Sequence, residues 1–144
     1  MVKIKIKKIH SDAIIPSYAH KGDSGMDIYS IENFELGILE RKLTKVGLSF
    51  EIPLGYEIQT RPKSGLAIKY GITLVNTPGT IDSSYRGELG IILINTSKEI
   101  YYVKKGEKIA QIVLQKVEEI EFEEVENISE TARGSGGFGS TGLK

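Results

Sequence analysis

Hydrophobic and polar residues alternate over short stretches of this 144-residue chain. In residues 2–8 (VKIKIKK) the alternation is strict, as expected for a β-strand with one face in water. β-Branched and aromatic residues also dominate five later stretches, at 43–52, 55–61, 88–95, 100–104 and 108–117. Turn sequences lie between several of them, at 53–55 (PLG), 95–99 (NTSKE) and 104–108 (KKGEK). The run IILI (91–94) predicts a strand that is buried on both faces.

A single stretch, residues 64–71 (SGLAIKYG), predicts a helix. Ser64 is suited to the N-cap, the interior is apolar, and Gly71 is a typical stop. Many short strands joined by regular turns are typical of a sandwich, a barrel or a jelly roll. The length favours one domain, so the sequence predicts an all-β domain with one short helix.

The composition excludes several kinds of site. The chain has no cysteine, which excludes disulfides, thiolate nucleophiles and cysteine-bound metals. Its two histidines, His10 and His20, have no second ligand at a useful spacing, so any metal is expected to be a hard cation bound by oxygen. Lys plus Arg and Asp plus Glu both number 19, so the net charge gives no reason to expect nucleic acid or membrane as a partner. With no apparent signal or transmembrane run, an intracellular, cytoplasmic protein is the default expectation.

The charge is nevertheless uneven along the chain. Residues 3–8 are basic, and residues 117–130 contain seven glutamates. We interpret both segments as solvated faces of edge strands, where charge prevents unwanted pairing. The alternative is that the two segments lie side by side across a subunit boundary.

The glycine-rich stretch RGSGGFGSTG (133–142) raises three alternatives. A P-loop needs a lysine where Ser140 stands, and a helix after it, so this alternative fails. A flexible tail is the ordinary interpretation of such a composition. Arg133, however, has the planar fork that suits phosphate oxygens, and Phe138 lies among glycines where it could stack on a base. These residues favour a lid that becomes ordered when a nucleotide binds.

Two internal segments also carry candidate chemistry. In RPKSGLA (61–67), Lys63, Ser64 and Gly65 form a candidate anion site at the start of the helix, although this stretch taken alone favours an ordinary capped helix with a surface lysine. In NTPGTIDSSYRGELG (76–90), turn residues flank Asp82. Its carboxylate either holds and deprotonates a water or only caps its own backbone in an Asx turn.

Two polar residues interrupt apolar stretches. Asp27 in SGMDIYS (24–30) requires a partner, either a buried arginine or a metal reached directly or through water. Gln111 in GEKIAQIV (106–113) either faces outward or directs its amide at a phosphate. Each residue also has a plain structural explanation.

In this order, five segments resemble the motifs of the trimeric dUTP diphosphatases (dUTPases): SGMDI, PKSGLA, GTIDSSYRG, GEKIAQ and RGSGGFGSTG. The resemblance covers residues 24–142. It implies a jelly-roll-like β-barrel of the β-clip type at 1–130 and a flexible active-site lid at 131–144. It also implies a homotrimer with shared active sites, Mg²⁺ as the cofactor, and hydrolysis of dUTP to dUMP and pyrophosphate. That activity limits uracil incorporation into DNA and supplies dUMP for dTMP synthesis.

The resemblance implies a role for each matching residue. Asp82 would be the general base, and Tyr85 would pack under the deoxyribose. The uracil would be read by Asn76, Thr80, Ile81 and Gly90, and covered by Phe138. The phosphates would be contacted by Lys63, Ser64, Gly65, Gln111, Arg133, Gly139, Ser140 and Thr141. Asp27 would position Mg²⁺ through water.

Three departures from the family pattern accompany the resemblance. Lys63 replaces the usual arginine, which changes a bidentate fork to a point charge. Ser24 and Ile28 replace the common Ala and Leu, and Ser84 stands where an acidic residue is frequent. Two other functions stay open at this stage: a dCTP deaminase-type relative, and a nucleotide-binding module without catalysis.

Overall fold

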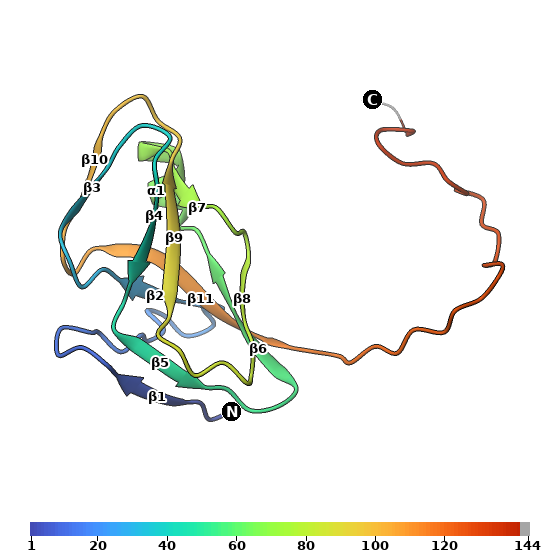
Figure 1. Ribbon diagram of the computed structural model, residues 1–144, viewed down its shortest axis with the longest axis horizontal. Coiled ribbons are helices and arrows are strands. Elements are labelled where there is room, and N and C mark those ends of the chain that lie inside the picture. The colour runs from blue at the N-terminus through green and yellow to red at the C-terminus, as the bar shows by residue number, and fades with distance from the viewer. Residues whose placement is uncertain (142–144) are drawn as a thin grey trace.

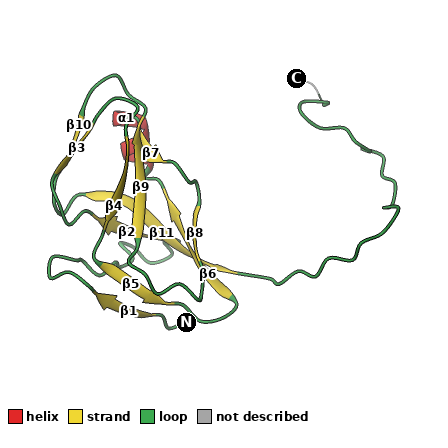
Figure 2. Ribbon diagram, in the orientation of Figure 1, coloured by secondary structure: helices red, strands yellow, loops and turns green. Residues whose placement is uncertain are grey.

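The computed structural model describes residues 1–141, which form eleven strands and one helix (Figure 2). The helix is α1 (Ser64–Tyr70). The strands are β1 (Lys5–Lys8), β2 (Gly25–Tyr29), β3 (Phe34–Leu36), β4 (Arg41–Lys45), β5 (Leu48–Glu51), β6 (Tyr56–Arg61), β7 (Ile72–Leu74), β8 (Gly79–Ile81), β9 (Gly90–Asn95), β10 (Tyr101–Val103) and β11 (Lys108–Lys116). The predicted fold class, all-β with one short helix, is confirmed.

The strands form four antiparallel sheets around one core. The largest has the order β2-β11-β6-β8, and the others have the orders β4-β9-β7, β1-β5 and β10-β3. Neighbours in these sheets are mostly distant in sequence, as in a jelly roll. The core consists of apolar side chains from the inner faces, among which Ile28, Leu36, Ile91 and Leu93 are fully buried.

The structure corrects two of the strand predictions. Residues 43–52 form two strands, because the chain bends at Gly47, whose φ of 71° is unfavourable for other residues. The run at 91–94 is buried on one face only: Ile91 and Leu93 are buried, whereas Ile92 and Ile94 are partly exposed. The pleat turns alternate side chains to opposite faces, and only one face of β9 packs on the core.

The helix is confirmed, but its predicted N-cap is wrong. Ser64 is the first helical residue, and Lys63, in an extended conformation, occupies the N-cap without a side-chain capping hydrogen bond. The helix therefore begins one residue earlier than an N-cap at Ser64 implies, because the extended backbone ends at Lys63 and the backbone of Ser64 is already helical. Gly71 ends the helix as predicted, with φ 65° and its N–H donating to the carbonyl of Ala67 at 3.1 Å.

The two charged segments differ in structure. The basic segment contributes β1, which pairs only with β5 and is therefore an edge strand, as expected. The acidic segment forms no strand, which corrects the prediction. β11 ends at Lys116, and the backbone N–H of Val117 still donates to the carbonyl of Gly55 at 2.9 Å. Beyond this hydrogen bond the chain extends away from the β-sheets as far as residue 141 (Figure 1).

No helix within residues 1–141 is long and apolar enough to cross a membrane. The seven residues of α1 extend over only about 10 Å at 1.5 Å per residue.

Candidate functional site

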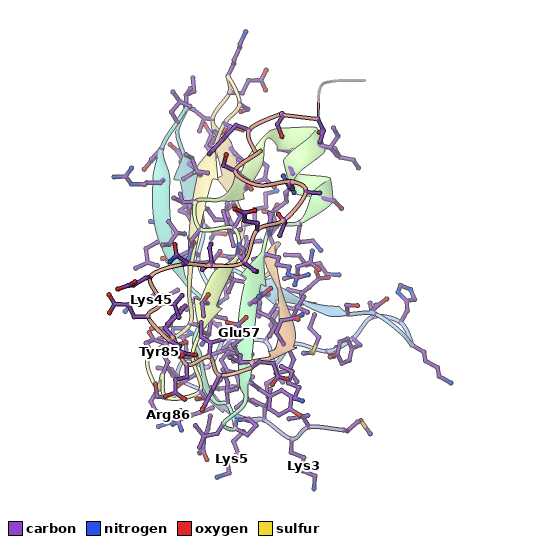
Figure 3. All side chains as sticks on the ribbon, turned by 90° about the vertical axis from the view of Figure 1, so that its right-hand side faces the viewer. Lys3, Lys5, Lys45, Glu57, Tyr85 and Arg86 are labelled. Carbon is purple, nitrogen blue, oxygen red and sulfur yellow. The ribbon has the colours of Figure 1, made fainter. Side chains whose placement is uncertain are left out.

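A cavity of about 400 Å³ lies between β8, β9 and the loop that joins them. Five of the predicted site residues line it: Thr80, Ile81, Asp82, Tyr85 and Gly90. The remaining lining residues, which the sequence did not indicate, are Leu43, Lys45, Glu88 and Ile92. Leu43 and Lys45 lie on β4, and the pairing of β4 with β9 brings them to this site, whereas Glu88 lies in the loop before β9 and Ile92 on β9 itself. Figure 3 shows Lys45, Tyr85 and Arg86 along one side of the molecule.

The loop between β8 and β9 is closed by its own hydrogen bonds. The N–H of Tyr85 donates to the backbone carbonyl of Asp82 at 3.1 Å, so the turn is closed by a main-chain acceptor. The guanidinium of Arg86 donates to the carbonyls of Ser83 and Tyr85 at 2.7 and 3.0 Å. The Asp82 carboxylate is exposed at the cavity, where it can contact a water. This geometry does not support the Asx turn and leaves the carboxylate available for the general-base alternative.

The start of β8 is packed tightly against Asn76. A Cβ added to Gly79 would lie 2.3 Å from Thr60 Oγ1 and 2.7 Å from Asn76 Nδ2, so only glycine fits there without displacement. Asn76 itself is exposed and does not line the cavity. The structure thus places it beside β8, at the edge of the predicted uracil site.

Asp27 lies in a second group of polar residues, on the opposite edge strand of the largest sheet. Its carboxylate accepts a hydrogen bond from Lys63 Nζ and lies 2.8 Å from Lys108 Nζ. Gln111, opposite Asp27 in the β2–β11 pair, donates its amide to the carbonyl of Pro62 at 3.0 Å. The partner required by Asp27 is therefore a pair of lysines and not an arginine. Lys108 was not identified from the sequence because its strand pattern is ordinary.

Electrostatics keep this carboxylate ionised. Partial burial raises the pKa of Asp27, whereas the hydrogen bonds and charges of Lys108 and Lys63 lower it. The lysine contributions outweigh the burial, so the pKa lies below the ordinary 3.8. The same hydrogen bond raises the pKa of Lys108. A cavity of about 310 Å³ adjoins Asp27 and Gln111, and the loop of residues 17–24 lines its other side. Ser64 and Gly65 are exposed at the start of α1.

One chain does not bring these two groups together. In the register of the largest sheet, Asp27, Gln111 and Arg61 lie opposite one another, and Thr80 lies opposite Gln59. Three strand spacings separate β2 from β8, which amounts to roughly 14 Å. The two cavities have no lining residue in common.

The glycine-rich tail is remote from both groups (Figure 1). Its turns are local: Arg133 Nε donates to the carbonyl of Gly136 at 2.8 Å, and the N–H of Ser140 donates to the carbonyl of Gly137 at 3.0 Å. The side chain of Phe138 is fully exposed. Gly139 and Thr141 belong to the same exposed end, and positions 142–144 of the predicted lid lie outside the described residues.

Comparison with known proteins assigns the family. The dUTPase family model matches residues 11–142. The chain belongs to the dUTPase family. The deoxyuridine 5'-triphosphate nucleotidohydrolases of Nautilia profundicola and Clostridioides difficile are 55% and 54% identical to it. Those alignments cover 98% and 99% of this dUTPase and 99% and 100% of the two relatives.

Solved structures agree with this dUTPase assignment. The Staphylococcus bacteriophage 80alpha dUTPase with dUPNHPP has a TM-score of 0.91 and 30% identity, covering 99% of this chain and 100% of the phage chain. A mutant dUTPase of phage phi11 of S. aureus, which coordinates a structural Mg(II) ion, has a TM-score of 0.83. It covers 90% of this chain at 24% identity, which establishes a shared fold and no more.

Proposed function

We propose that this dUTPase hydrolyses dUTP to dUMP and pyrophosphate. The observation that carries the proposal is the cavity of about 400 Å³, which gathers Asp82, Tyr85 and the backbone of β8. The activity is the one for which the relatives at 54–55% identity are named. The phage dUTPase at 30% identity binds dUPNHPP, a dUTP analogue. The cellular consequences would be a low dUTP level and a supply of dUMP.

In the proposed mechanism, Asp82 is the general base. Its exposed carboxylate accepts a proton from a water, and that water breaks the linkage between the α- and β-phosphate groups. Negative charge develops on the phosphate oxygens, and fixed cations stabilise it. Lys63 is the phosphate contact, with Ser64, Gly65 and Gln111 as hydrogen-bonding partners.

The base and the sugar are recognised by the cavity that contains Asp82. The short strand β8 presents backbone groups of Thr80 and Ile81, which together with Gly90 and Asn76 would pair with the uracil edge. A mismatched base would leave these groups without partners, which makes discrimination steep. The half-exposed ring of Tyr85 would lie under the deoxyribose.

The residues around Asp27 fit Mg²⁺ only together with a nucleotide. Within residues 1–141, no group of three or more His, Asp or Glu side chains could hold a metal. The charge of Asp27 is balanced by two lysines, so these side chains alone have no excess negative charge to attract a dication. A triphosphate adds that charge and further oxygen ligands. When bound, Mg²⁺ would neutralise phosphate charge, and Asp27 would hold its water shell.

We further propose a homotrimer with shared active sites. The separation of roughly 14 Å between the two groups would be bridged if each site took them from different subunits. The tail at 131–144 would then act as a lid on a neighbour, with Arg133, Ser140 and Thr141 on phosphate and Phe138 on uracil. The acidic segment at 117–130 could meet the lysines of β1 on that neighbour. Sedimentation tests this, and a monomeric mass in an active sample would contradict it.

A panel of deoxynucleoside triphosphates with Mg²⁺ tests the reaction itself. We expect pyrophosphate from dUTP and little from the other nucleotides. Ammonia from dCTP without pyrophosphate would instead support the deaminase alternative.

Asp82→Asn tests the catalytic role. The variant should bind dUTP and lose turnover, whereas the matched change Glu32→Gln, at a surface carboxylate that lines neither cavity, should retain turnover. Turnover in Asp82→Asn would reject the general base. Binding without turnover in the wild-type protein would favour the non-catalytic module.

A further inference from the structure

Glu88 connects the Tyr85 ring to the body of the protein. Its backbone carbonyl accepts a hydrogen bond from the Tyr85 hydroxyl at 2.9 Å. Its carboxylate accepts the N–H of Gly47 at 2.9 Å through Oε1, and Oε2 lies 3.5 Å from Lys45 Nζ. The Glu88 side chain is only 19% exposed, so its hydrogen bond with Gly47 is partly shielded from water, whereas Lys45 and the Tyr85 hydroxyl bond are exposed. One residue therefore fixes both the tyrosine and the bend between β4 and β5.

Further hydrogen bonds attach the same loop to β5. The N–H of Leu89 donates to the carbonyl of Leu48 at 2.8 Å, and Ser49 Oγ donates to the carbonyl of Arg86 at 2.8 Å. The loop therefore rests on the start of β5 on both sides of Glu88. Hydrogen bonds to an ionised carboxylate are the stronger kind, which gives the Glu88 contacts a large share of this attachment.

Gly87 provides the space that the ring occupies. A Cβ added there would lie 2.3 Å from the Tyr85 hydroxyl oxygen and 2.4 Å from its Cζ atom. The ring therefore lies directly against the Gly87 backbone. Its backbone φ is not in the left-handed region, so alanine at this position would act through its contact with Tyr85 and not through backbone strain.

We propose that Glu88 is a positioning residue that sets the discrimination between deoxyribose and ribose. The inference rests on the proposed function, in which Tyr85 lies under the sugar. Excluding a single hydroxyl requires the ring to be held to within the size of one oxygen atom. Tyr85 is 45% exposed and packs loosely on its own, so the hydrogen bond to Glu88 and the contact with Gly87 must supply that precision.

The test compares kcat/KM for dUTP and for UTP, with Mg²⁺, in four variants. Glu88→Ala removes the acceptor for Gly47, and we expect the dUTP-to-UTP ratio to fall by about tenfold or more. Glu88→Gln keeps an amide oxygen for that N–H and should retain the ratio within about threefold. Gly87→Ala should lower the ratio by displacing the ring. Glu32→Ala removes a surface carboxylate 4.0 Å from Lys42, away from the cavity, and should leave the ratio unchanged.

The outcomes separate this inference from the proposed function. A wild-type protein without dUTP hydrolysis would contradict the proposed function. If the wild-type protein hydrolyses dUTP and the folded Glu88→Ala variant has the same dUTP-to-UTP ratio of kcat/KM, the positioning role is overturned. Circular dichroism and Tm establish that the variant is folded. If it is not, Gly87→Ala decides, because an unchanged ratio there would show that the ring position does not govern the choice of sugar.

Discussion

The lysine pair around Asp27 makes a stability prediction that the structure quantifies. Asp27→Asn removes the charge but keeps the shape and one acceptor oxygen. The amide N–H₂ group then faces a lysine, so one of the two hydrogen bonds from Lys63 and Lys108 is lost. Lys108 is about half exposed, so its ammonium group can rotate toward solvent and hydrogen-bond to water. Lys63 is only 26% exposed, so more of the free-energy cost of a lost hydrogen bond remains there.

The expected loss in free energy of unfolding is about 1–2 kcal/mol at pH 7, between the value of an exposed pair and that of a buried one. For a domain of this size the loss lowers Tm by roughly 3–8 °C. Calorimetry without nucleotide measures it, at a fixed protein concentration because subunit association also affects Tm. Asp23→Asn is the matched control: its carboxylate accepts the N–H of His20 at 2.8 Å, and asparagine can still accept it.

The pH dependence gives a second check on the same variant. The folded-state pKa of Asp27 lies below 3.8, so its ionised form stabilises the folded state above that pH. The contribution is lost as the pH falls through the folded pKa, where wild-type Asp27 becomes protonated. The difference in Tm between the wild-type protein and Asp27→Asn should therefore be greatest at neutral pH and shrink progressively below pH 3.8. An equal Tm at pH 7, or an undiminished difference in acid, would refute the ion-pair explanation.

Three further predictions concern the tail, the core and the phosphate contact. Truncation after Ala132 should leave Tm unchanged and lower kcat/KM for dUTP by about a hundredfold, since the lid would be absent; full activity would show that the tail has no role. Leu93→Ala, at a fully buried position, should cost about 3 kcal/mol in urea unfolding, and a loss below about 1 kcal/mol would mean that the core closes around the gap. Lys63→Arg should keep kcat/KM within about threefold, whereas Lys63→Met should lose more than about tenfold; equal values would remove Lys63 from phosphate binding.

The fold class and the family could be predicted correctly from the sequence, which also proposed the main site segments. Alternation of apolar and polar residues is a local property, so the strands within 2–8 and 108–117 could be predicted without tertiary information. The helix end at Gly71 could also be predicted, because glycine readily adopts the left-handed backbone found there. Asp82 was recognisable because turn residues flank it. Strands β2, β3, β7 and β8 were missed. The last three have three residues each, too few to show a period of two, and β2 carries Asp27 in an otherwise apolar stretch.

Only the tertiary structure decided which side chains meet. Glu88 and Gly47 are 41 residues apart, and Asp27 and Lys63 are 36 apart, so neither contact leaves a local pattern. Lys108 meets Asp27 through the pairing of β2 with β11, and Lys63, just after β6, meets it because β6 pairs with the other side of β11. The clamp on Tyr85 follows from the packing of its loop on the bend between β4 and β5. Strand pairing is determined by long-range contacts, through burial of one face of each sheet, and it placed the cavity at Asp82 and the lysine group at Asp27 on separate edges of the same sheet.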